Sequence, residues 1–165
     1  MKRPDSELRR ERLVFYEADI AELHSELDAF LELSKARSAM LIDVDGHMVT
    51  VRGETLQASQ DTISALVAGS FAATKELARL LGEAEFASMF HQGQHESIQL
   101  QLIGQRTLLA VVLDDRTNLG LVRFYAQEVT ARLQQVFDRI ASEDRDASIS
   151  NDFSSEGAAA LDELF

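Results

Sequence analysis

Residues 62–74, Thr-Ile-Ser-Ala-Leu-Val-Ala-Gly-Ser-Phe-Ala-Ala-Thr, carry no charge, although charged residues make up 27% of the chain. At helical spacing this region shows two apolar stripes. The first is broad: Ile63, Leu66, Val67, Phe71, Leu77, Ala78 and Leu81. The second, called the small-residue stripe below, holds Ala65, Ala68, Gly69, Ala72 and Ala73. A surface helix normally has one charged face, so this helix requires a cover, either a partner protein or its own domain on both sides.

The composition indicates one globular domain. The chain has 165 residues, of which 45% are hydrophobic, enough for a single core. No run approaches the roughly 18–20 apolar residues that a membrane span needs, and no apolar segment follows residues 1–5 as in a signal peptide. The chain has no cysteine and therefore neither a disulfide nor a thiolate metal site. These features favour a cytoplasmic protein.

The net charge of −12 argues against binding to nucleic acid or to an anionic membrane, because phosphates would be repelled. Its distribution is uneven. Residues 142–165 hold seven acidic residues and one arginine, whereas residues 1–12 are basic through Lys2, Arg3, Arg9, Arg10 and Arg12. The composition predicts a basic N-terminal extension (residues 1–12), a folded domain (13–141), an acidic flexible linker (142–155) and a short amphipathic C-terminal helix (156–165).

Periodicity and turn signals predict the order α-β-β-α-β-β-β-α. A first helix runs from Leu13 to about Lys35, the uncharged helix runs from Asp61 to Gly82, and a last helix covers 129–140. Strands are predicted at 39–44, 48–51, 97–103, 108–113 and 119–125, with an irregular connection over 82–94. Every neighbouring strand pair can form a hairpin. The expected fold is therefore an α/β two-layer domain with a five-stranded antiparallel sheet and packed helices.

Two segments suggest contacts with partners. The strand at 97–103 alternates polar and apolar residues, and we interpret it as a sheet edge available for dimerisation through Ile98, Leu100 and Leu102. At the C-terminus Leu161, Leu164 and Phe165 lie on one side of the short helix. An apolar tip on an acidic tether suits binding in a groove of another protein, and the alternative is a frayed end that folds back on its own domain.

The motifs for catalysis are weak. Neither a P-loop nor a dinucleotide-binding glycine motif is present. Asp43 and Asp45 at a strand end, with Asp114 and Asp115 at another, resemble the carboxylates of a magnesium-dependent phosphatase. We favour a simple hairpin turn at Asp45-Gly46, because the strand order lacks parallel βαβ units.

Further polar residues have ordinary explanations. His91 and His95 with Glu96 have the spacing of zinc ligands, but Gly93 interrupts the helix that they would need. We therefore interpret them as polar loop residues. Arg106 and Arg116 are loop arginines that could stabilise phosphate charge in a partner enzyme. We assign no catalytic residue, no metal site and no cofactor.

Four stretches in order resemble the roadblock/LC7 family and, within it, the bacterial MglB type. They are residues 66–74, Leu-Val-Ala-Gly-Ser-Phe-Ala-Ala-Thr; 80–86, Leu-Leu-Gly-Glu-Ala-Glu-Phe; 90–93, Phe-His-Gln-Gly; and 112–123, Val-Leu-Asp-Asp-Arg-Thr-Asn-Leu-Gly-Leu-Val-Arg. The similarity runs from about residue 13 to 140, and residues 161–165 look like the C-terminal helix of that type. Lys75 and Glu76 depart from the small or neutral residues of related helices.

The resemblance implies a homodimer that binds a small Ras-like GTPase of the MglA type in bacterial cell polarity or motility. Such a protein is a regulator and not an enzyme: it accelerates GTP hydrolysis by holding the switch residues of the GTPase, and its C-terminal helix promotes nucleotide exchange or binding. The implied contact helix carries the small-residue stripe and Glu76, and the implied location is a cell pole. Because roadblock proteins also act as scaffolds, a GTPase-positioning protein without stimulation is the alternative.

Overall fold

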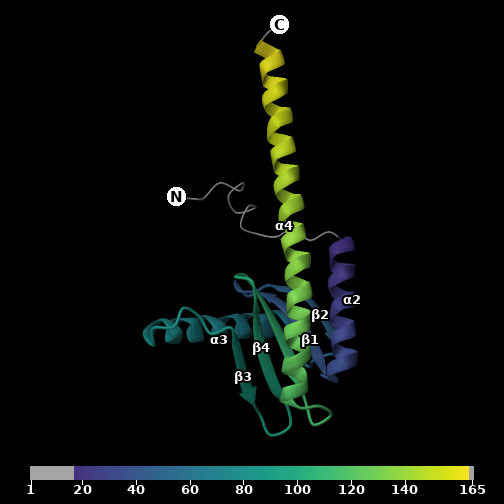
Figure 1. Ribbon diagram of the computed structural model, residues 1–165, viewed down its shortest axis with the longest axis vertical. Helices are drawn as coiled ribbons and strands as arrows, with labels where there is room; N and C mark the ends of the chain where they lie inside the picture. Colours follow the sequence, from purple (N-terminus) through teal and green to yellow (C-terminus); the bar gives the residue numbers. More distant parts are fainter. Residues whose placement is uncertain (1–16, 164–165) are drawn as a thin grey trace.

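A five-stranded antiparallel sheet forms the centre of the computed structural model, which describes the backbone of residues 17–163 and the side chains of residues 17–147 and 149 (Figure 1). The strand order across the sheet is β2-β1-β5-β4-β3. The strands are β1 (Ser38–Asp43), β2 (Met48–Gly53), β3 (Ser88–Gln92), β4 (Ser97–Ile103) and β5 (Thr107–Leu113). All four neighbouring pairs are antiparallel, so β2 and β3 are the two edges.

Helices cover the two faces of the sheet unequally. Helices α2 (Glu17–Ser34) and α4 (Leu119–Glu163) pack against each other and against one face, whereas α3 (Gln60–Leu80) lies alone on the other. Figure 1 shows that α4 projects far beyond the sheet and that the C-terminal half of α3 extends past the edge strand β3.

Each face has its own apolar cluster because side chains alternate along a strand. On the face of α2 and α4, Leu41, Leu109 and Val111 pack with Leu27 and Leu133. The cluster beneath α3 joins further strand residues to two helix residues: Met40, Ile42, Leu100, Leu102, Leu108, Ala110 and Val112 with Val67 and Phe71. The central strand β5 is buried along its whole length, as expected for a strand with helices on both faces.

The predicted fold class and element order are confirmed, but two strand positions were wrong. Residues 119–125 begin α4: Asn118 caps the helix by accepting a hydrogen bond from the Leu121 amide at 2.9 Å, and Val122, Ala126 and Val129 are buried at helical spacing. The fifth strand is β3, which lies in the segment predicted to be irregular.

The interpretation of residues 97–103 as a dimer edge was also wrong. Strand β4 pairs with β3 on one side and with β5 on the other, so its backbone groups are occupied. Leu100 and Leu102 are buried in the cluster beneath α3, and Ile98 packs partly against it. The polar residues of the strand do not mark solvent either, because Gln99 is fully buried on the opposite face. The free edge on this side of the sheet belongs to β3.

The structure differs from the predicted flexible linker as well. Helix α4 is continuous from Leu119 to Glu163 and therefore includes residues 142–155. The segment has no proline, and no glycine lies between Gly120 and Gly157, so nothing in it interrupts a helix. Leu161 belongs to the same helix, but its side chain is not described. The predicted contact residues Leu164 and Phe165 and the basic residues 1–12 lie outside the described residues. No helix within residues 17–163 is long and apolar enough to cross a membrane.

Candidate functional site: the outer face of helix α3

Helix α3 is defined at both ends by local sequence. The Ser59 hydroxyl caps the first turn by accepting a hydrogen bond from the Thr62 amide, and Asp61 adds a favourable negative charge there. At the other end Gly82 adopts a φ of 78°, and the Glu83 amide donates to the Ala78 carbonyl at 2.9 Å. This is a Schellman motif, which glycine favours because it adopts positive φ without strain.

The broad apolar stripe of the sequence divides between two faces of α3. Val67 and Phe71 are buried against the sheet, and Ala78 is also buried. In contrast, Leu66 is 69% exposed and Leu77 is 51% exposed, although both are large and apolar. The helix therefore carries leucines on its outer side, which nothing among the described residues covers. The exposed leucines of this region are Leu66, Leu77, Leu80 and Leu81.

The small-residue stripe also divides. Ala68 is buried, and the β1–β2 turn lies close to it: a Cβ added at Gly46 would be 3.8 Å from the Ala68 Cβ and 3.5 Å from the Ala65 Cα. These two alanines are thus small because the hairpin turn approaches them. Gly69, Ala72 and Ala73 are exposed, and a Cβ added at Gly69 would meet no atom within 4 Å. This second part of the stripe and the exposed Ala65 are open to a partner, whereas Ala68 is not.

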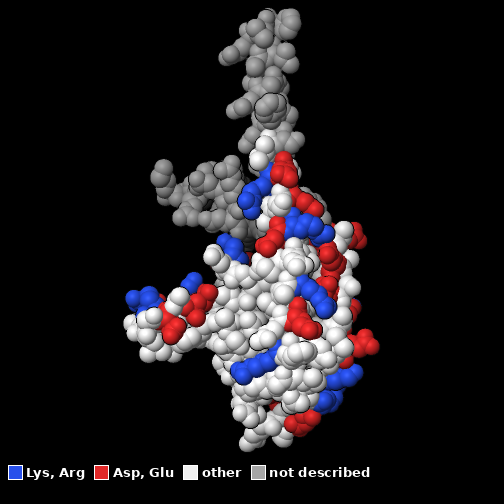
Figure 2. Space-filling view, in the orientation of Figure 1, with Lys and Arg blue, Asp and Glu red and all other residues white. Residues whose placement is uncertain are grey.

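The open face of α3 carries a single charged residue, and other charges lie beside it near the end of the helix. The last turns of α3 hold Lys75, Glu76 and Arg79, and the Arg79 Nε donates to the Glu76 carboxylate at 2.9 Å. Figure 2 shows charged side chains at the projecting end of α3 and along α4. We define the outer face of α3 as Ala65, Leu66, Gly69, Ala72, Ala73, Glu76, Leu77 and Leu80. Glu76 is its only charged member.

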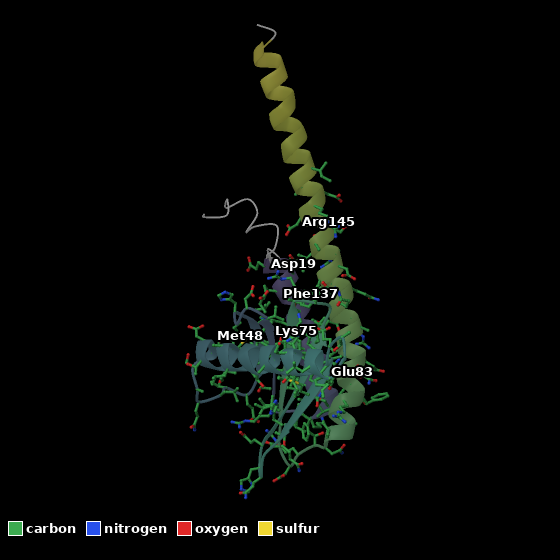
Figure 3. The ribbon with its side chains drawn as sticks, turned by 90° about the vertical axis from the view of Figure 1, so that its left-hand side faces the viewer. Asp19, Met48, Lys75, Glu83, Phe137 and Arg145 are labelled. Carbon is green, nitrogen blue, oxygen red and sulfur yellow. The ribbon has the colours of Figure 1, made fainter. Side chains whose placement is uncertain are left out.

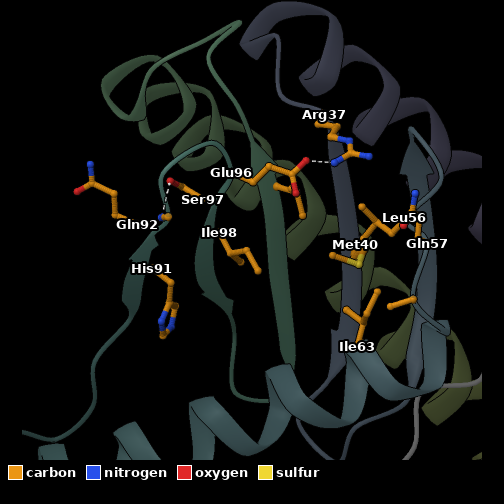
Figure 4. A pocket seen from close by; sticks show the side chains of 13 residues that line it. Arg37, Met40, Leu56, Gln57, Ile63, His91, Gln92, Glu96, Ser97 and Ile98 are labelled. Atoms are coloured by element: carbon orange, nitrogen blue, oxygen red, sulfur yellow. Dashed lines mark hydrogen bonds and ion pairs between the residues drawn. The ribbon is translucent and has the colours of Figure 1, made fainter.

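Beside α3 the same side of the sheet is hollowed into a groove of about 700 Å³ (Figure 4). Its apolar floor includes Met40, Ile98 and Val112, and Ile63 of α3 forms one wall. At one end the ion pair between Arg37 and Glu96 closes the groove. The groove reaches the edge strand β3, and sequence reasoning missed it because its lining residues come from separate elements.

The residues of the phosphatase alternative are not brought together. Asp43 lies at the end of β1, where the antiparallel register pairs it with Thr107 at the start of β5. Asp114 follows the other end of β5, one strand length away. Asp45 is held by Arg106 at 3.0 Å, and its own amide donates to Asp43 at 2.8 Å, as in a polar turn. The interpretation of Asp43 and Asp45 as turn residues fits this geometry.

The two histidines and the two loop arginines were the other polar candidates. His95 lies in the turn after strand β3, whereas His91 lies in the strand itself, so its interpretation as a loop residue was wrong. No group of three potential metal ligands occurs among the side chains that the structure describes, residues 17–147 and 149. Arg116 pairs with Asp114 at 2.9 Å and with Glu54 at 2.6 Å. Its hydrogen bonds lower the pKa of both carboxyl groups below their ordinary values. The two loop arginines, Arg106 and Arg116, thus hold turns and strand ends together.

Comparisons with known proteins agree with this architecture. The family model described as the Roadblock/LC7 domain matches residues 23–113. No curated protein sequence matches the chain. Among solved structures, the gliding protein MglB of Thermus thermophilus is 36% identical, with 79% of this chain and 96% of that chain covered and a TM-score of 0.67.

Two further solved structures are similar over most of their length. Myxococcus xanthus MglB is 31% identical, with 72% of this chain and 96% of that chain covered and a TM-score of 0.69. A structure described as MglB with tetrameric arrangement is also 31% identical, with 78% and 96% covered and a TM-score of 0.73. The described architecture, the family model and these similarities lead to one conclusion: the chain belongs to the roadblock/LC7 family and, within it, is similar to the MglB proteins.

Proposed function

We propose that this chain forms a homodimer that binds a small Ras-like GTPase of the MglA type and accelerates its GTP hydrolysis. The observation that carries the proposal is the outer face of α3, where exposed leucines and small residues form a surface with a single charged residue on a chain with a net charge of −12. Exposed contiguous apolar surface of this kind marks protein contacts. The similarity to MglB proteins supports the choice of a GTPase as the partner.

The unpaired edge and the projecting helix support self-association. Strand β3 has one free side, and the end of α3 that extends past β3 carries Leu77, Leu80 and Leu81. If two β3 strands pair about a two-fold axis, each projecting helix end reaches over the sheet of the other copy. There the groove floored by Met40, Ile98 and Val112 offers an apolar surface of matching character.

The mechanism that we propose is conformational. The outer face of α3 offers alanine, glycine and leucine side chains but no general base, and its one charged residue, Glu76, pairs with Arg79. Its contribution is therefore binding energy, which favours the arrangement of the switch segments of the GTPase that hydrolyses GTP. The end of α4 is a second proposed contact that promotes nucleotide exchange, and the bound complex concentrates at a pole of the cell.

A single-turnover measurement tests this proposal. GTP hydrolysis by the cognate MglA-type GTPase is followed with and without this protein, and stimulation of at least tenfold is expected. Ala72→Arg places a long charged side chain on the contact surface and is expected to abolish both binding and stimulation. The matched control is Ala131→Arg on an exposed position of α4, which keeps full activity.

Each outcome separates the alternatives. Binding without stimulation assigns the chain to the class of scaffolds that position a GTPase. Normal stimulation by Ala72→Arg excludes the outer face of α3 as the contact surface. Circular dichroism of both variants shows whether the fold is retained.

A further inference from the structure

The groove beside α3 contains one titratable side chain without a partner among the described residues. The charged or titratable residues that line the groove are Arg37, His91 and Glu96. Arg37 and Glu96 form the ion pair that closes one end. His91 is exposed and makes no hydrogen bond or ion pair with any residue that the structure describes. Histidine is the side chain that ordinarily changes charge between about pH 5 and pH 8.

His91 faces the side of the sheet on which α3 lies. Side chains alternate along β3, so His91 shares a face with Met89, which packs against the cluster beneath α3. Phe90, between them, packs against the cluster on the opposite face. Figure 4 shows the imidazole of His91 directed toward α3, and its partner in the register of β4 is the apolar floor residue Ile98. In the single chain this end of the groove is open, so the imidazole is in contact with water.

A second copy would cover His91, and this inference therefore rests on the homodimer of the proposed function. A two-fold axis perpendicular to the sheet, which pairs the two β3 strands, keeps both His91 side chains on the same face. The projecting end of α3 from the other copy reaches over that face with the exposed residues Leu77, Leu80 and Leu81. Apolar side chains then replace water around the imidazole and accept no hydrogen bond from it.

The charge on the approaching helix does not favour a protonated imidazole. Glu76 and Arg79 pair with each other, whereas Lys75 is exposed and has no ion pair among the described residues. Lys75 has the same sign as a protonated histidine. Glu83 has the opposite sign, but it lies in the loop after the helix and is exposed to water (Figure 3). Protonation of both copies of His91 also adds two like charges to one face of the joined sheet.

We propose that His91 makes the self-association of this protein dependent on pH. The neutral imidazole is buried beneath the helix end of the second copy, and protonation opposes this burial because a charge would be taken out of water without a counter-charge. The effect acts twice, since each copy contributes one imidazole. The dimer is therefore favoured above the pH range in which imidazole becomes protonated and dissociates as the pH falls through it. Acidification then lowers any activity that requires the dimer.

Sedimentation equilibrium of the full chain at about pH 8 and about pH 5.5 tests the proposal. The dissociation constant of the wild-type dimer is expected to rise at least about tenfold at the lower pH. His91→Gln has a polar side chain that stays neutral, so this variant is expected to lose most of the rise. His91→Lys is positively charged at both pH values and is expected to dissociate at pH 8 as readily as the wild type does at pH 5.5.

The matched control is His95→Gln. His95 is exposed in the turn after β3 and does not line the groove, so this variant keeps the pH response of the wild type. Comparison with the histidine variants also removes the contribution of the remaining carboxylates, which titrate equally in all of them. Circular dichroism at both pH values shows that dissociation occurs without unfolding, and unfolding of the wild type at pH 5.5 would overturn the proposal.

The outcomes separate this proposal from the proposed function. A dimer at pH 8 whose dissociation constant is unchanged at pH 5.5, or changes equally in His91→Gln, overturns the role of His91 and leaves the homodimer in place. Tighter association of the wild type at pH 5.5 that His91→Gln removes also overturns it and would assign His91 to an ion pair with Glu83. A chain that is monomeric at both pH values overturns the homodimer, and the role of His91 with it.

Discussion

The two faces of the sheet differ in how completely the chain covers them. On one face α2 and α4 together bury Leu23, Leu27, Leu133 and Ile140, each 1% exposed or less. On the other face α3 lies alone, with a groove beside it and with Leu66 and Leu80 each 69% exposed. A face that is closed by its own helices serves stability, whereas a face left half covered is available for association.

The comparison also explains why the two helices of the closed face tolerate charge. Acidic residues of α2 meet arginines of α4 across the edge of the seam, as Glu26 does with Arg132. The outer face of α3 has only Glu76, which pairs within its own helix. Surface charges exposed on both sides of a seam add little to stability but oppose incorrect pairing. The open face lacks such charges and is apolar enough to accept a partner.

The largest expected effect is a loss of stability when a leucine of the closed face is truncated, compared with a leucine of the open face. Leu133→Ala removes a fully buried side chain from the closed face and is expected to lower the free energy of unfolding by about 2–5 kcal/mol. Leu77→Ala on the open face should leave the isolated fold almost unchanged, within about 0.5 kcal/mol, while weakening self-association. Urea unfolding at several protein concentrations distinguishes the two, because only loss through association depends on concentration. A concentration-independent loss in Leu77→Ala would contradict the assignment of the open face.

Smaller changes in stability, of opposite sign, are expected when two glycines are replaced by alanine. Gly46 has a φ of 95° in the turn against α3, so Gly46→Ala should lower stability by about 1–2 kcal/mol. Gly69 lies within the helix with no neighbour in reach of a Cβ, so Gly69→Ala should raise stability by about 0.5–1 kcal/mol. The methyl group at position 69 should nevertheless weaken GTPase binding. Thermal unfolding and a binding titration check both statements, and tighter binding by Gly69→Ala would be evidence against close contact there.

The smallest expected effect concerns the ion pairs of Glu54, one of which is with Arg37 at the groove. Glu54 accepts hydrogen bonds from Arg116 at 2.6 Å and from Arg37 at 3.0 Å, and the bond from Arg116 is the main cause that lowers its pKa below the ordinary value of 4.5. A lowered pKa stabilises the fold above pH 4.5, and this contribution disappears as the pH falls through the folded-state pKa. The urea midpoint of the wild type should therefore drop more between pH 7 and pH 3.5 than that of Glu54→Gln. Glu85→Gln, at an exposed loop position, is the control and should follow the wild type.

The sequence predicted the order of the elements because long helices and hairpins leave strong local signals. One such signal is the helical spacing, in steps of three and four residues, of Leu13, Tyr16, Ile20 and Leu23. Another is the hairpin turn at Asp45-Gly46. The start of α4 was mistaken for a strand because Val122, Phe124 and Tyr125 are typical of strands. The cap at Asn118 was the local signal that could have corrected it.

Other features could not be derived from local patterns. Strand β3 is short, and its residues Ser88 and His91 have no strand preference, so its place follows from pairing with β4. The two parts of the small-residue stripe look alike in the sequence, and only the approach of Gly46 distinguishes Ala68 from Gly69. The outer face of α3 was therefore predicted as a surface, while the division between internal packing and open surface required the fold.

The continuity of α4 has a consequence for whatever lies at its end. A helix of 45 residues is about 67 Å long. Its end therefore has one orientation relative to the domain, whereas the end of a flexible linker would take many. The number of residues in the helix then determines both how far the tip lies from the domain and which way it faces around the helix axis. Two residues inserted after Ser142 would turn the tip by about 200°, whereas seven inserted residues would restore its azimuth and move it outward by about 10 Å.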